Sequence, residues 1–213
     1  MRFRRKSGTE DGDADVSSDA PSDASTDAPV GPVGPFDAAD VEDLEERECI
    51  DLGSLLVTPV GDVEMRLQVD EESGDVIAAV LVGDQGALEL RAFAASRGGG
   101  AWDELRPRIV EETERMGGQV TEQEGTFGPE LLCLVPVQTP EGEQATQANR
   151  VVAHEGRNWL LRATLMGQPA VEPDEAGPWE ETIRQTVVRR GREAMAPGMP
   201  LPLTLPAEAR RVD

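Results

Sequence analysis

The sequence predicts an α+β fold, with a mostly antiparallel sheet of about seven strands, two helices packed on it, and a disordered acidic N-terminal tail. Three observations lead to this prediction. Many segments alternate apolar with polar residues and are joined by short turns, two segments have helical periodicity, and residues 159–166 are apolar on both faces. A strand covered on both sides lies in the interior of its sheet. We therefore expect the two helices to cover one face each.

The chain is expected to have three parts. Residues 1–48 are rich in Asp, Ser, Ala, Pro and Gly, and they have too little apolar surface to offset the entropy of ordering. This segment is predicted to be a disordered acidic tail. A single α+β domain is expected over residues 49–194. A Pro-rich extended segment should follow over residues 195–213.

The first half of the domain should be a meander followed by a helix. Residues 50–60 are interpreted as an irregular apolar lead-in, because Gly53 and Pro59 interrupt it. Strands are predicted over residues 63–69, 76–82 and 87–94. The residues of one helical face follow, namely Trp102, Leu105, Ile109, Thr113 and Met116. Pro107 is acceptable only within about the first turn of that helix, since deeper it removes a backbone hydrogen bond.

The second half repeats strands and then a helix. The four predicted strands cover residues 119–124, 131–137, 144–154 and 159–166, and a helix begins near Pro178. Pro136 within a strand indicates a bulge or an edge position. The final residues 195–206 contain too much Pro for a helix or a central strand. They are expected to run extended, either as a strap across this domain or as a ligand for a partner's groove.

Composition argues against several function classes. The net charge of −22 repels nucleic-acid phosphates and anionic lipid, so neither nucleic acid nor a membrane is an expected partner. Two cysteines, Cys49 and Cys133, form no zinc or disulfide pattern, and Cys133 is expected to be a buried small hydrophobe. The lone His154, expected at the surface, cannot supply a triad or a histidine-rich metal site. No cofactor or metal site is expected, and the absence of a secretory signal pattern predicts a cytoplasmic location.

Four residues are candidates for contact with a ligand or a partner. Arg91 and Arg162 each lie in a largely apolar strand, and a buried guanidinium must be paired. They could face an anionic ligand, form an internal salt bridge, or extend along the sheet margin. Phe127, in a predicted turn, is either an exposed anchor for a partner or packed on the core. Trp102 is most simply the anchor of the first helix.

The leading functional hypothesis is a non-enzymatic protein-interaction module. It depends on the missing catalytic constellations, the acidic tail and the apolar C-terminal segment. The alternative is a small-molecule binding domain with a pocket between sheet and helix, where Arg91 or Arg162 meets an anionic ligand. An enzyme is a third possibility without a specific residue pattern to support it.

Several sequence blocks together resemble a known family. They are the Asp-rich segment after MRFRRK, IDLGSLLV, LELRAFAA, WDELRPRIVEE, EGTFGPEL, RNWLLRATLMG and MAPGMPLPLTLP. In this order they resemble an uncharacterised actinobacterial family, the domain of unknown function numbered thirty-seven-ten. The resemblance implies an actinobacterial, cytoplasmic origin and transfers no activity, cofactor or catalytic residue. The order of elements is also similar to the Mog1/PsbP-like arrangement, as a fold-level analogy.

Overall fold

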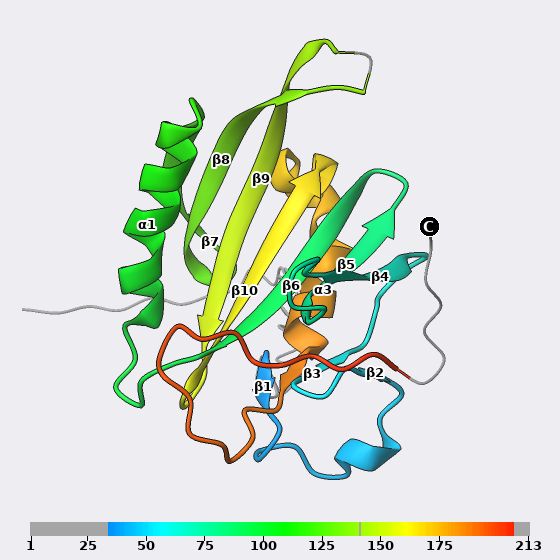
Figure 1. Cartoon of the computed structure of the whole chain (residues 1–213). Coiled ribbons are helices and arrows are strands. Elements are labelled where there is room, and N and C mark those ends of the chain that lie inside the picture. The colour runs from blue at the N-terminus through cyan, green and yellow to red at the C-terminus, as the bar shows by residue number, and fades with distance from the viewer. Residues whose placement is uncertain (1–33, 141, 207–213) are drawn as a thin grey trace, which may run out of the picture. The chain divides into compact units, whose positions relative to one another are not determined.

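The computed structural model describes residues 34–140 and 142–206. Their main element is a seven-stranded sheet with the order β4-β5-β6-β10-β9-β8-β7, in which all neighbours are antiparallel (Figure 1). The strands are β4 (Glu64–Val69), β5 (Val76–Gly83), β6 (Gly86–Ala94), β7 (Gln119–Gly125), β8 (Gly128–Gln138), β9 (Gln144–Glu155) and β10 (Trp159–Gly167). The predicted α+β fold and its antiparallel sheet are confirmed. As the two apolar faces of β10 indicated, this strand is the central one.

A second, small sheet forms from segments far apart in the chain. It has the order β1-β11-β3-β2 and consists of β1 (Phe36–Asp37), β2 (Ile50–Asp51), β3 (Leu55–Val57) and β11 (Val187–Val188). Residues 50–60, interpreted as an irregular lead-in, thus contain two short strands, β2 and β3, and no long regular element. Strands of two or three residues carry no readable periodicity. Their pairing depends on β11, which follows more than a hundred positions later.

The segment assigned to the acidic tail extends into this sheet. Phe36 and Asp37 pair with β11, and a short 3₁₀ helix, η1 (Leu44–Glu46), precedes β2. Ordered chain thus begins upstream of Ile50. The predicted disorder of residues 1–33 lies outside the described residues.

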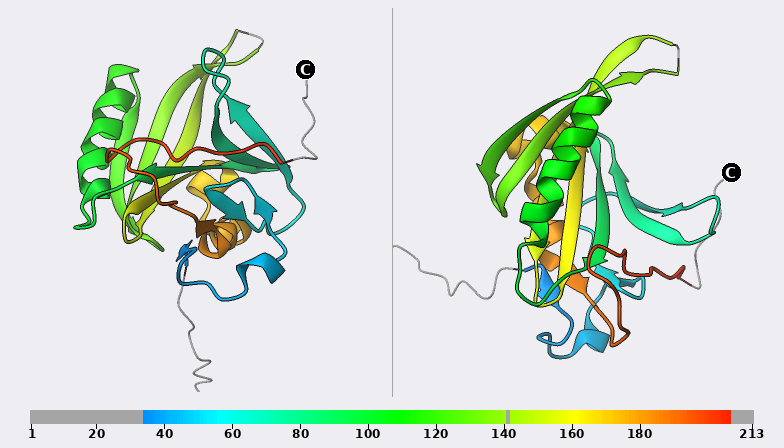
Figure 2. Two further views of the ribbon diagram at one scale, coloured as in Figure 1. Left: turned by 60° about the horizontal axis from the view of Figure 1, so that its bottom comes forward. Right: turned by 60° about the vertical axis from the view of Figure 1, so that its left-hand side comes forward.

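The helices lie on opposite faces of the main sheet (Figures 1 and 2). Helix α1 (Ala101–Arg115) contacts β7, β8 and β9. The other face carries α2 (Gln168–Val171), the 3₁₀ helix η2 (Pro173–Glu175) and α3 (Gly177–Gln185). Two apolar clusters result, one around Trp102 beneath α1 and a larger one around Trp159 and Trp179. Each face of the sheet therefore carries its own helices, as predicted, and on the α1 side the cover extends over only part of the sheet.

Two prolines test the predictions about backbone hydrogen bonds. Pro107 is the seventh residue of α1, deeper than the sequence analysis allowed. Its missing N–H leaves the carbonyl of Asp103 without a helical donor, and Asp103 is on the exposed side of the helix, where water can replace that donor.

Pro136 lies beyond Leu134, the last residue of β8 that pairs with β7, so β8 is an edge strand at Pro136. The predicted edge position is confirmed.

The C-terminal strap, residues 198–204, fills a gap in the main sheet. Strands β5 and β6 stay paired only as far as Ala79 and Leu90. Beyond that point the Ala94 N–H donates to the Met199 carbonyl at 2.8 Å, and the Leu201 N–H donates to the Ala92 carbonyl at 2.8 Å. Leu203 forms bridges to Gly53 and Val76.

The alternation of Leu and Pro explains why this segment suits the gap. Leu201 and Leu203 are buried and belong to the larger apolar cluster, whereas Pro200 and Pro202 are exposed. Because the prolines lack N–H groups, they leave no unpaired donor on the side of the strap that faces away from β6. Of the two alternatives left open by the sequence, the structure shows the strap across this domain.

Candidate functional site

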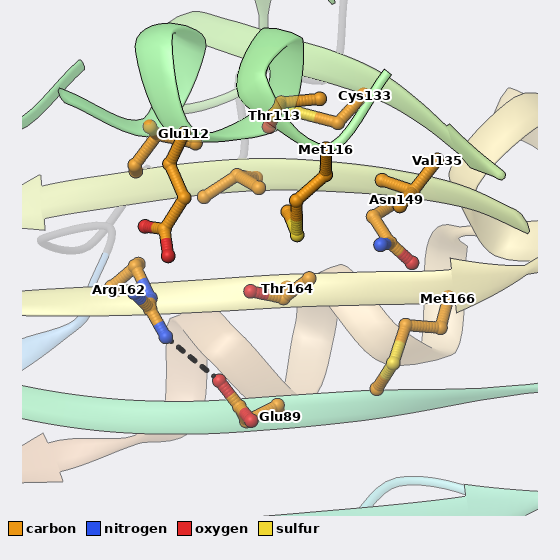
Figure 3. Close-up of a pocket in the computed structure, with 12 residues that line it drawn as sticks. Glu89, Glu112, Thr113, Met116, Cys133, Val135, Asn149, Arg162, Thr164 and Met166 are labelled. Atoms are coloured by element: carbon orange, nitrogen blue, oxygen red, sulfur yellow. Dashed lines mark hydrogen bonds and ion pairs between the residues drawn. The ribbon is translucent and has the colours of Figure 1, made fainter. Parts of the chain in front are cut away.

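A cavity of about 310 Å³ lies between the C-terminal half of α1 and strands β6, β8, β9 and β10 (Figure 3). Its position agrees with the pocket between sheet and helix considered from the sequence. The apolar lining consists of Ile109, Met116, Cys133, Val135, Val151 and Met166. The polar lining consists of Glu89, Glu112, Thr113, Asn149, Arg162 and Thr164.

The cavity exists because one helix cannot cover seven strands. A helix is about 10 Å wide and neighbouring strands are about 4.8 Å apart, so α1 covers two or three strands. Strand β10 lies at the margin of this cover. On the α1 side it presents Arg162, Thr164 and Met166, which are half-buried, whereas Leu161 and Leu165 on its other face are buried. The sheet face beside α1 is therefore partly polar and open.

Arg162 lies at the cavity wall and forms an ion pair with Glu89 of the neighbouring strand. Its Nη2 donates to Glu89 Oε1 at 2.9 Å, and both side chains are 19% exposed (Figure 3). The guanidinium carbon lies 5.7 Å from the centre of the Phe93 ring. The Nε atom is buried and has no hydrogen-bond partner among the described residues. An internal salt bridge, one of the three possibilities considered for Arg162, is thus what the structure shows.

Arg91 lies directly opposite Arg162 in the register of β6 and β10 but does not line the cavity. Its Nε donates to the carbonyl oxygen of Ile77 at 3.1 Å. Burial lowers the pKa of Arg91, while the nearby Glu89 carboxylate raises it and Arg162 lowers it further. Both arginines were candidates from the sequence, but only Arg162 lies at the cavity in the structure.

Glu112 is the cavity residue that the sequence analysis missed. It is not among the residues of the helical face predicted from the sequence. In the structure it points across the cavity toward Arg162 (Figure 3), and within the described part of the chain its carboxylate has no ion pair or hydrogen bond. Its spacing from Ile109 and Met116, three and four positions, was the available signal.

Cys133 is a buried part of the cavity floor, in agreement with its prediction as a small hydrophobe. Burial raises the pKa of its thiol, and a hydrogen bond with Thr113 lowers it to a smaller extent. The thiol is therefore protonated at neutral pH. Cys133 contributes apolar surface rather than an activated nucleophile.

Trp102 and Phe127 both pack against the domain itself, and neither lines the cavity together with Arg162. The Trp102 indole is 7% exposed and its Nε1 donates to the Pro129 carbonyl at 2.7 Å, which anchors the start of α1. Phe127 occupies the two-residue turn between β7 and β8, is half-buried, and packs against the larger apolar cluster. The guanidinium of Arg184 lies 5.6 Å from its ring centre. Of the two alternatives for Phe127, the structure shows packing on the core.

A buried charge network lies on the face of the sheet opposite the cavity, and the sequence analysis did not single it out. Arg150 Nη2 contacts Glu180 Oε1 at 2.7 Å, and Arg150 Nη1 lies 3.8 Å from Glu130 Oε1. Gln123 donates to Glu130 at 2.7 Å, and Thr126 donates to Glu180 at 2.8 Å. These contacts join α3 to strands β8 and β9 and to the β7–β8 turn. We interpret the network as a structural connection.

His154 is half-buried, contrary to the expected surface position, and its ring centre lies 5.8 Å from that of Trp159. Burial lowers its pKa below the ordinary value of 6.5, while Glu155 acts in the opposite direction. Below about pH 6.5 the unfolded chain therefore binds more protons at this position than the folded one. The contribution of neutral His154 to the unfolding free energy is therefore fully present above that pH. It is lost as the pH falls through the pKa that His154 has in the folded state.

We expect His154→Gln to flatten the pH dependence of the unfolding free energy between pH 7.5 and 5. Urea unfolding of both proteins at several pH values measures this difference. The carboxylates titrate in both proteins, so their contribution cancels in the comparison. Equal slopes for the two proteins would contradict the burial effect at His154.

Two further observations concern membranes and metals. Within residues 34–140 and 142–206, no helix is long and apolar enough to cross a membrane. The same residues contain no group of three or more His, Cys, Asp or Glu side chains placed to hold a metal ion.

The comparisons with known proteins identify a family. No curated protein and no solved structure matches the chain, and the Mog1/PsbP-like analogy and the actinobacterial origin stay predictions. A family model matches residues 34–212, which include every strand and helix described above. As the sequence blocks indicated, the chain belongs to the family described as "Protein of unknown function (DUF3710)".

Proposed function

We propose that this domain binds a small amphipathic molecule in the cavity between α1 and the sheet. The observation that supports this function is the cavity itself, about 310 Å³ in volume and lined by six apolar and six polar residues. Small-molecule sites in proteins are typically concave and of roughly 300–1,000 Å³. The cavity is at the lower end of that range and suits a small ligand.

The polar groups of the lining have capacity left for a ligand. Among the described residues, the Arg162 Nε and the Glu112 carboxylate have no hydrogen-bond partner. Ile109 and Val151 provide apolar contact beside them. The Cys133 thiol enters the lining protonated and His154 is not part of the lining, which is consistent with the reversible binding that we propose.

The interaction-module hypothesis has less support in the described residues. Phe127 packs against the core, and the strap at 198–204 is built into the sheet, so both surfaces suggested for a partner already have intramolecular contacts. The acidic segment 1–33 lies outside the described residues. Ligand binding in the cavity is therefore the better supported proposal.

The test is a screen of small amphipathic compounds by protein NMR, with the variant Thr164→Met. The half-buried Thr164 lines the open cavity, so the larger methionine should occupy ligand volume without disturbing the core. We expect binding to weaken about tenfold or more, which corresponds to about 1.4 kcal/mol. Thr121→Met on exposed β7 is the matched control and should bind as the wild type does. The proposal fails if no compound shifts resonances of the cavity residues, or if Thr164→Met binds equally well.

A further inference from the structure

We infer that the ligand of this cavity carries a protonated amine on an apolar body. This inference rests on the proposed binding function and adds the chemical class of the ligand. It is carried by the juxtaposition of the unpaired Glu112 carboxylate with the Glu89–Arg162 ion pair across the cavity (Figure 3).

The charges of the lining favour a cation over an anion. Its ionised groups are the carboxylates of Glu89 and Glu112 and the guanidinium of Arg162, which Glu89 already pairs. An anionic ligand would compete with Glu89 for Arg162 and would also face Glu112. A cation would instead meet a carboxylate that has no partner in the described chain. The structure thus reverses the sign of the ligand charge considered from the sequence.

Acceptor oxygens from three elements are available for an ammonium group. Glu112 on α1 offers its carboxylate, and Glu89 uses only Oε1 for Arg162, which leaves Oε2. The Thr164 hydroxyl comes from the residue directly opposite Glu89 in the register. An ammonium group has three N–H donors and no acceptor, so it matches a set of oxygens better than a hydroxyl or a carboxylate does.

The apolar body of the ligand would lie on flexible side chains. Met116 is 55% exposed at the rim of the cavity, and Met166 lines it from β10. Methionine is unbranched and polarisable, and it adapts to ligands of different shape. A bound alkyl chain would cover the exposed Met116 side chain.

We expect the preference for a cationic ligand to be moderate and to weaken as the salt concentration rises. Glu112 is exposed, so its ion pair with an amine is screened by solvent. The net charge of −22 adds a field that attracts cations to the molecule in general. A selective contribution from Glu112 must therefore be separated from this general attraction by a matched variant.

The experiment compares hexylammonium, hexanol and hexanoate, which share one apolar chain and differ in charge. Each is titrated at pH 7 into the full-length protein, and binding is followed by amide NMR shifts of the cavity residues. We expect hexylammonium to bind about three- to tenfold more tightly than hexanol, and hexanoate to bind most weakly. Glu112→Gln should remove most of the difference between hexylammonium and hexanol.

The control is Glu111→Gln, one position earlier on the same helix. Glu111 contacts the exposed Arg115 at 3.4 Å and does not line the cavity, yet its loss changes the net charge by the same amount. This variant should keep the amine preference of the wild type.

The outcomes separate the two proposals. If all three compounds bind with equal affinity, or if Glu112→Gln keeps the full amine preference, the amine inference is overturned while ligand binding stands. If Glu111→Gln loses the preference as fully as Glu112→Gln, the preference is a general field effect and the inference is again overturned. If none of the three shifts the cavity resonances, cavity binding itself is contradicted.

Discussion

Removal of residues 195–213 is expected to destabilise the domain by about 5 kcal/mol or more, which is comparable to the whole stability of many domains. Two buried leucines of the strap, Leu201 and Leu203, would be lost from the larger apolar cluster. Burial of one such side chain contributes about 1.5–3 kcal/mol, and the space that it leaves adds to the cost. The backbone groups of Ala92 and Ala94 would also lose their partners. Urea unfolding followed by Trp fluorescence measures the change.

A pair of point variants tests the same idea without truncation. Leu201 is 3% exposed and Leu205 is 59% exposed. We expect Leu201→Ala to cost about 2–5 kcal/mol and Leu205→Ala less than about 0.5 kcal/mol. Equal effects of the two substitutions would show that the strap does not contribute to the core. A peptide of residues 195–206 added to the truncated protein should restore stability in a concentration-dependent way.

Arg150→Ala is expected to cost about 3–5 kcal/mol, because it leaves buried carboxylates without their counter-charge. The side chains of Glu130 and Glu180 are only 3% and 12% exposed. Arg184 still contacts Glu180 at 3.1 Å, so Glu130 should carry the larger part of the penalty. Chemical unfolding at pH 7 measures the loss.

The control for this prediction is an exposed ion pair of the same type. Arg157 contacts Asp40 at 3.1 Å, with side chains that are 67% and 58% exposed. Arg157→Ala should cost at most about 1 kcal/mol. If Arg150→Ala lowers the unfolding free energy no more than Arg157→Ala does, burial does not increase the contribution of the Arg150 network to stability. The combined variant Glu130→Gln, Arg150→Met should recover part of the loss, because it removes the uncompensated charge.

The main sheet and its central strand followed from local patterns in the sequence. Alternation with period two, short turns and the doubly apolar segment 159–166 report on neighbouring residues, and together they predict an antiparallel sheet covered on both faces. The same holds for the inner face of α1, with Trp102 as its anchor. Met116 is the exception, because the helix ends before it and leaves it at the rim of the cavity.

The candidate site was only half predictable. Arg162 stood out because a charge in an apolar strand must be compensated. Its partner Glu89 depends on the register between β6 and β10, and the role of Glu112 depends on where α1 crosses the sheet. Neither relation is encoded in spacing along one segment, so the sequence left an anionic ligand, an internal pair and a position along the sheet margin open for Arg162.

The sequence by itself determined the fold class, the central strand, the anchored helix and the family. Only the tertiary structure decided the small sheet around β11, the insertion of the strap beside β6, the buried partners of Arg150 and the net charge of the cavity. The physical reason is the range of the interactions. Periodicity reports contacts between residues a few positions apart, whereas these features depend on pairing between segments separated by tens to more than a hundred residues.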